Sequence, residues 1–90
     1  MQRFPLGQLM ITPGALAALK QSKQTPLPFL YRHVSGDWGD LDAEDQEAND
    51  FAVVQGRRIL STYTLNAGVK IWCITEADRS ATTILLPEED

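Results

Sequence analysis

The first part of the chain shows the apolar spacing of amphipathic helices. Thr12-Pro13 is a favourable helix start, because a threonine side chain can cap the first turn and proline fits the first helical position. Four apolar residues then follow at helical intervals: Ala15, Leu16, Ala18 and Leu19. We therefore predict a helix from Pro13 to about Ser22. The preceding residues, Met1 to Ile11, predict an extended arm or a short edge strand.

Two further helices are predicted downstream. Thr25-Pro26 repeats the same start, and Gly36 is placed to end a second, short helix. A third helix from Ala43 to Gln55 is indicated by Asp42 as a capping residue and by Gly56 as a stop. Its core-facing stripe is expected to consist of Ala48, Phe51, Ala52 and either Val54 or Gln55.

After Gly56 the apolar pattern changes to a period of two, which is typical of strands. The alternation over Arg57 to Leu65 predicts a first strand. Asn66-Ala67-Gly68 suits a hairpin loop, because glycine readily adopts the left-handed backbone conformation that such loops use. Val69 to Thr75 and Ala81 to Leu86 are rich in β-branched residues and predict two more strands.

The predicted fold class is α+β, with three N-terminal helices packed on one face of a C-terminal three-stranded antiparallel meander. Ninety residues suffice for one hydrophobic core but not for two, so residues 1–90 are predicted to form a single domain. Val69 to Thr75 carries large apolar residues on both faces and is predicted to be the middle strand. The residues expected to be buried are Phe51, Ile59 or Leu60, Ile71 or Trp72, and Leu85.

The composition argues against several classes of function. The formal net charge of −4 argues against nucleic acid as a direct ligand, because such binding depends on clustered Lys and Arg. A single cysteine, Cys73, allows no internal disulfide and no thiolate metal site, and is expected to be a buried small hydrophobe. No apolar run reaches the length of a membrane span, and the N-terminus lacks the order of a signal peptide. We expect a cytoplasmic protein without a cofactor, a metal or a membrane partner.

The segment from Asp37 to Asp50 contains seven carboxylates and no Lys or Arg. One interpretation is a solvated helix face; the other is an acidic surface that binds a basic partner. Trp38 likewise either anchors a helix connection against the core or supplies the central aromatic contact of that surface. The candidate partner-binding residues are Asp37, Trp38, Asp40, Asp42, Glu44, Asp45 and Glu47.

An alternative interpretation is a site for metal-free cleavage of RNA. Such a site would use His33 for proton transfer and an arginine to stabilise the transition state. It requires His33, Arg58 and one of Ser61, Thr75 or Thr83 to converge at an open cleft. We expect that they do not converge, because threonine is also a common strand residue for packing alone. No phosphate-binding loop, nucleophile elbow or paired-carboxylate arrangement is evident.

Several segments together carry a family resemblance over most of the chain, from about Phe4 to Glu89. They are His33, Gly36-Asp37-Trp38-Gly39, Arg58-Ile59-Leu60-Ser61, Gly68-Val69-Lys70-Ile71-Trp72, Ile74-Thr75-Glu76-Ala77-Asp78-Arg79-Ser80 and Thr82-Thr83-Ile84-Leu85-Leu86-Pro87-Glu88-Glu89. With these residues the chain resembles a family of short uncharacterised bacterial proteins of plasmids and integrative elements, labelled plasmid-related protein or type I restriction subunit M. The resemblance implies an accessory protein of a mobile genetic element. A methyltransferase is excluded, because ninety residues cannot hold a nucleotide-cofactor domain.

The order of helices and strands is also similar to the ribonuclease-like fold of barnase-type and RelE-type toxins. This second resemblance concerns the fold alone. Three strands are one fewer than that fold generally has, unless the N-terminal arm supplies the fourth.

The function expected from these observations is that of a small acidic protein-binding factor of a mobile element, inhibiting a host defence system such as CRISPR interference or restriction. Its partner would be a protein with a basic, nucleic-acid-handling surface. The alternative is a small metal-free ribonuclease or toxin-like domain, and a purely structural or regulatory interaction module is a third possibility. The sequence leaves the oligomeric state open.

Overall fold

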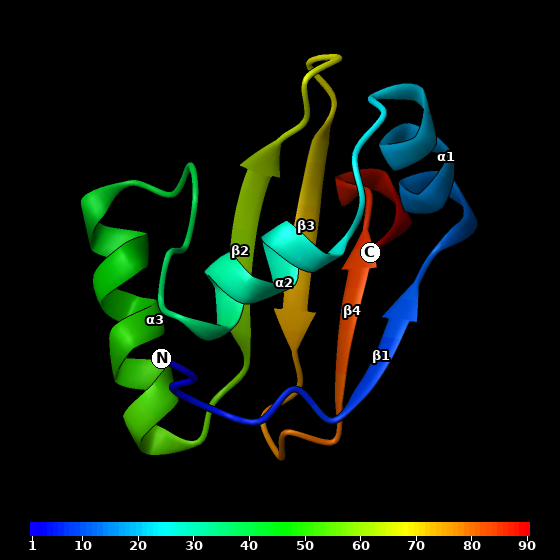
Figure 1. Ribbon diagram of the computed structural model, residues 1–90. Helices are drawn as coiled ribbons and strands as arrows, with labels where there is room; N and C mark the ends of the chain where they lie inside the picture. The colour runs from blue at the N-terminus through cyan, green and yellow to red at the C-terminus, as the bar shows by residue number, and fades with distance from the viewer.

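A four-stranded mixed sheet forms the centre of the molecule (Figure 1). The computed structural model describes residues 1–90. The strands are arranged in the order β1-β4-β3-β2, with β3 antiparallel to both of its neighbours and β1 parallel to β4. Their bounds are β1 Gln8–Ile11, β2 Ile59–Thr64, β3 Lys70–Thr75 and β4 Ala81–Leu85. The helices are α1 Pro13–Gln21, α2 Leu27–Val34 and α3 Ala43–Gln55, and a 3₁₀ turn, η1 Pro87–Glu89, follows β4.

The predicted three-stranded antiparallel meander behind three N-terminal helices is wrong. β1 precedes all three helices and adds a fourth, parallel strand, so the helices lie between strands in the chain order. The backbone of β1 is tied to β4 at both ends, where Gln8 N donates to Ser80 O (2.9 Å) and Thr12 N donates to Ile84 O (3.0 Å). A strand of four residues, paired with a segment about seventy positions later, leaves no local periodic signal.

Other parts of the prediction are confirmed. The N-terminal arm contains a short edge strand, and β3 is an interior strand of the sheet. α3 has the predicted bounds: the Asp42 side chain accepts from Asp45 N (2.8 Å), and Gly56 ends the helix with φ +67°. α1 begins as expected, since Thr12 Oγ1 accepts from Ala15 N (3.2 Å). No helix in the molecule has the length and apolar character needed to cross a membrane.

One face of the sheet carries the main core. Eight side chains on this face, from β2, β3 and β4, are at most 1% exposed: Ile59, Ser61, Tyr63, Ile71, Cys73, Thr75, Thr82 and Ile84. Apolar residues of α1 and α2 pack on their central part, and Phe4, Trp38 and Ala52 pack on Ile59 at the β2 side. The burial of Cys73, Ile59, Ile71 and Leu85 confirms those predictions.

α3 stands beside β2, at the opposite edge of the sheet from β1 (Figure 1). Of its predicted core stripe only Ala52 is buried. The other members are wrong, since Phe51 is 53% and Val54 77% exposed, and the second buried residue of the helix is Asn49. The reason is a polar anchor that outweighs apolar periodicity. The Asn49 side chain donates to Leu60 O (2.6 Å) and accepts from Leu60 N (3.3 Å), and so satisfies the backbone of β2 at that position.

The outer edge of β2 is also paired by the segment before α3. Thr62 N donates to Trp38 O (3.2 Å), and Asp40 N donates to Thr62 O (2.7 Å). Gly39, with φ +77°, lies between these bonds, where a Cβ would overlap the Thr62 carbonyl. This position therefore requires glycine. The pairing protects β2 from association with other strands.

We expect Asn49→Ala to lower the free energy of unfolding by about 2 kcal/mol, because it leaves the Leu60 N–H and C=O without their partner in a partly buried position. Asn66→Ala, in the exposed hairpin loop, is the matched control and should change stability by less than about 0.5 kcal/mol. Urea denaturation followed by circular dichroism measures both. Equal effects of the two substitutions would mean that the Asn49 amide does not hold α3 on β2.

Candidate functional site

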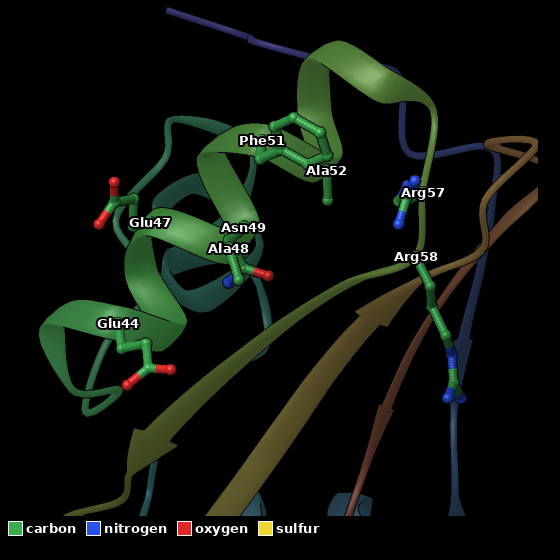
Figure 2. Close-up of a pocket in the computed structure, with 8 residues that line it drawn as sticks. All are labelled: Glu44, Glu47, Ala48, Asn49, Phe51, Ala52, Arg57 and Arg58. Carbon is green, nitrogen blue, oxygen red and sulfur yellow. The ribbon is translucent and has the colours of Figure 1, made fainter.

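A shallow groove of about 580 Å³ runs along α3 at the start of β2 (Figure 2). Glu44 and Glu47 lie at one end of the groove and Arg57 and Arg58 at the other, with Phe51 between them (Figure 2). The Arg57 guanidinium lies over the Phe51 ring, 5.4 Å from its centroid. The groove thus combines an exposed aromatic ring with charges of opposite sign at its two ends.

The carboxylates expected to bind a partner fall into two groups. Asp37, Asp40 and Asp42 are engaged within the chain. Arg32 holds Asp37 in a two-pronged ion pair (Nε to Oδ2 2.7 Å, Nη2 to Oδ1 3.3 Å), and this hydrogen bonding lowers the pKa of Asp37. Asp40 accepts from the Thr64 hydroxyl (2.7 Å), while Asp42 caps α3. These three carboxylates stabilise local structure.

The second group consists of Glu44, Asp45 and Glu47 on the first two turns of α3. All three are exposed, and none of them is within ion-pair distance of a Lys or Arg. Asp45 contributes only its backbone N–H to the helix cap. Their charges are therefore free to act on another molecule.

Trp38 is buried, with 3% of its surface exposed. Its ring stacks on Phe4 (centroids 6.2 Å apart), and its Nε1 donates to Asp50 Oδ1 (3.1 Å). That hydrogen bond, together with one from Arg3, lowers the pKa of Asp50. Trp38 is thus the core anchor of the connection between α2 and α3, and the exposed aromatic residue beside the free carboxylates is Phe51.

A chain of hydrogen bonds crosses the core from β2 to the N-terminal arm. His33 Nδ1 lies 2.5 Å from Ser61 Oγ, and Nε2 lies 2.9 Å from Thr75 Oγ1. Thr75 Oγ1 is 2.7 Å from Thr82 Oγ1, which donates to Leu6 O (2.7 Å).

The Leu6 carbonyl, at the end of this chain of hydrogen bonds, determines which group donates in each bond. Because the single Thr82 proton goes to Leu6 O, Thr75 must donate to Thr82, and His33 Nε2–H must donate to Thr75. His33 Nδ1 then accepts from the Ser61 hydroxyl. The network is complete with a neutral imidazole carrying its proton on Nε2.

The prediction that His33, Arg58 and one of Ser61, Thr75 or Thr83 do not converge at an open cleft is confirmed, although His33 does contact Ser61 and Thr75. The open cleft required for catalysis is not formed by them, however, since all three are fully buried. Burial lowers the pKa of His33 to about 4. Arg58 lies elsewhere, beside Glu76 (3.9 Å) and Asp90 (3.5 Å) on the surface. Thr83 alternates with Thr82 and so faces the other side of the sheet.

The two residues that sequence reasoning did not place in the site are Phe51 and Arg57. Phe51 fits a core stripe on apolar periodicity, and only the Asn49 anchor turns it outward. Arg57 carried a usable signal, because Arg57-Arg58 comes directly after the stop of an acidic helix. Helix ends of opposite charge indicate an electrostatically polarised surface.

No group of three or more His, Cys, Asp or Glu residues is arranged to hold a metal ion. Burial also raises the pKa of the Cys73 thiol to about 12, so this side chain is not a reactive thiolate. Comparison of the chain with protein-family models, with curated proteins and with solved structures gives no match.

Proposed function

We propose that this chain is a small protein-binding factor that binds a basic partner through the exposed side of α3. The observation that carries the proposal is the set of three exposed, unpaired carboxylates, Glu44, Asp45 and Glu47, on the helix that also presents the half-exposed ring of Phe51. Glu44 and Glu47 line the same groove as that ring. We call these four residues the α3 surface. Carboxylates accelerate encounter with a basic protein, and an aromatic side chain supplies contact energy once water is excluded.

The partner that this surface fits is a protein whose Lys or Arg residues normally bind phosphate. Exposed carboxylates close together on one helix concentrate negative charge at the surface, as the phosphates of a nucleic-acid strand do. The acidic side chains would then occupy the place of the nucleic acid. In the setting implied by the resemblance to mobile-element proteins, the partner is a host defence protein of CRISPR interference or restriction.

The second candidate is a metal-free ribonuclease, favoured by the contact between His33 and Ser61. The buried imidazole has no path to a substrate while Phe4 packs edge-on against it (centroids 5.3 Å apart). We expect no cleavage of single-stranded RNA by the purified protein. Cleavage that is lost in His33→Gln would favour the ribonuclease over the binding factor.

We expect reversal of Glu44, Asp45 and Glu47 to Lys to weaken partner binding at least tenfold, because three attractive charges become repulsive. Asp42 is left intact, since removing this cap costs about 1 kcal/mol. Partners are captured from a bacterial lysate at low salt and then measured individually by calorimetry. Affinity of the wild type should fall as salt rises.

Two single substitutions separate the surface from overall charge. Glu44→Lys and Glu88→Lys change the net charge equally, but Glu88 is exposed near the C-terminus, outside the α3 surface. Only Glu44→Lys should weaken binding. Equal loss of affinity in both variants would show that net charge alone matters, and unchanged affinity in the triple variant would exclude the α3 surface.

A further inference from the structure

The solvent side of α3 carries an apolar stripe that stays largely exposed, with the Arg57 guanidinium over its central ring, Phe51. Ala48, Phe51 and Val54 follow at helical intervals on this side, and all three are exposed. A stripe of this kind normally faces a protein core, and here the Asn49 anchor turns it outward. The stripe is therefore available to a second surface that would bury it.

Opposite charges flank the stripe at nearly equal distances along the chain. Glu44 lies seven residues before Phe51 and Arg57 six residues after it. Neither has an ion-pair partner within the chain. Figure 2 shows the two carboxylates, Glu44 and Glu47, at one end of the groove and the two arginines at the other.

This pattern is complementary to itself under a two-fold rotation. When two α3 helices pack antiparallel and cross near Phe51, residues at equal distances on either side of the crossing point face each other. Glu44 and Glu47 of one copy then lie beside Arg57 of the other, while the two Phe51 rings meet near the axis and each Val54 faces Ala48 of the other copy. A parallel arrangement would place like charges together.

From this symmetry we infer that the chain forms a two-fold symmetric homodimer through α3. A helix of thirteen residues is about 20 Å long, so the interface is below roughly 1,200 Å² in total. An interface of that size gives a reversible dimer, with a Kd on the order of micromolar to tens of micromolar. Because charge pairs contribute at its rim, the dimer should dissociate as salt is added.

The dimer also bears on the proposed function, and this step rests on it. Dimerisation covers Glu44, Glu47 and Phe51, which belong to the α3 surface. A basic partner and a second copy would then compete for the same helix face. The protein at high concentration would be a reserve form that dissociates when its partner is present.

The test is sedimentation velocity of the purified full chain over about 5 µM to 1 mM in low salt. The monomer mass is 10.0 kDa, and the wild type should approach twice that mass at the upper concentrations. Phe51→Ser should weaken association at least tenfold. Tyr31→Ser removes a comparably exposed aromatic residue from α2 and should leave association unchanged. A wild type that stays monomeric at 1 mM, or equal behaviour of the two serine variants, would overturn the inference.

A charge exchange tests the antiparallel geometry itself. The double variant Glu44→Lys with Glu47→Lys, and the single variant Arg57→Glu, should each be monomeric, because like charges then face each other. An equimolar mixture of the two should dimerise again, since each substituted end meets its complement. Restored association also shows that both variants are folded, and a mixture that remains monomeric would exclude this arrangement.

Sedimentation of the purified chain, in which no partner is present, and capture of partners from a lysate together separate the two proposals. A dimer without any captured partner would retain the inference and remove the proposed function. A captured partner without a dimer would do the reverse.

Discussion

Trp38→Ala is expected to lower the free energy of unfolding by about 3–5 kcal/mol, the cost of removing a large aromatic side chain from a packed core. The ring is almost fully buried, stacks on Phe4, and contacts the His33 ring edge-on with centroids 5.9 Å apart. The substitution also removes the donor to Asp50. Thermal and urea unfolding measure the loss, which is a large share of the stability of a small domain.

Tyr31→Ala is the matched control for this prediction. Tyr31 is an aromatic residue at 67% exposure on α2, and its removal should change stability by less than about 0.5 kcal/mol. Trp38→Phe keeps an aromatic ring but loses the indole N–H and part of the ring volume, so we expect an intermediate loss of about 2 kcal/mol for that variant. If Trp38→Ala were as mild as Tyr31→Ala, Trp38 would be a surface residue and a possible partner contact after all.

Acidification between pH 7 and pH 5 is expected to lower the free energy of unfolding by about 2 kcal/mol through His33. Burial lowers the pKa of this imidazole from 6.5 in the unfolded chain to about 4 in the folded protein. Between these values the unfolded chain binds the proton and the folded chain does not, so stability falls as pH decreases. The full effect, about 3 kcal/mol, is reached only below pH 4.

The interval from pH 7 to pH 5 isolates this effect, because His33 is the only histidine in the chain. The carboxylates with lowered pKa, among them Asp37, Asp50 and Glu89, lose their contributions only nearer their ordinary values around 4. His33→Gln keeps a donor and an acceptor for Thr75 and Ser61, and it should abolish the fall in the free energy of unfolding between pH 7 and pH 5. An NMR titration of the wild type gives the imidazole pKa directly. A value of 6 or above would contradict the burial of His33 in its hydrogen-bond network.

The sequence patterns were enough to predict those helices and strands whose formation depends on neighbouring residues alone. The bounds of α3 follow from Asp42, which caps the first turn, and from Gly56, which ends the helix in the left-handed conformation. Both effects depend on the neighbouring backbone alone. Apolar alternation identified β2, and β-branched residues identified β3 and β4, because both patterns are properties of a single strand. Large apolar residues on both faces of β3 indicated its interior position. The burial of Cys73 followed from the same pattern.

The tertiary structure alone decided the features that join distant segments. β1 was expected as an extended arm or a short edge strand, but its parallel pairing with β4, about seventy positions later, could not be seen in four residues. Phe51 faces solvent because the two hydrogen bonds between the Asn49 side chain and the Leu60 backbone fix the rotation of α3 about its axis.

His33 met Ser61 and Thr75, residues 28 and 42 positions away, and the core closed over them, which makes them a satisfied polar network instead of an open site. The acidic residues of α3 and the two arginines before β2 were visible in the sequence, but their placement at the two ends of one groove was not. Sequence therefore determined which elements form and which charges they carry, and long-range hydrogen bonding determined which of their faces meet solvent.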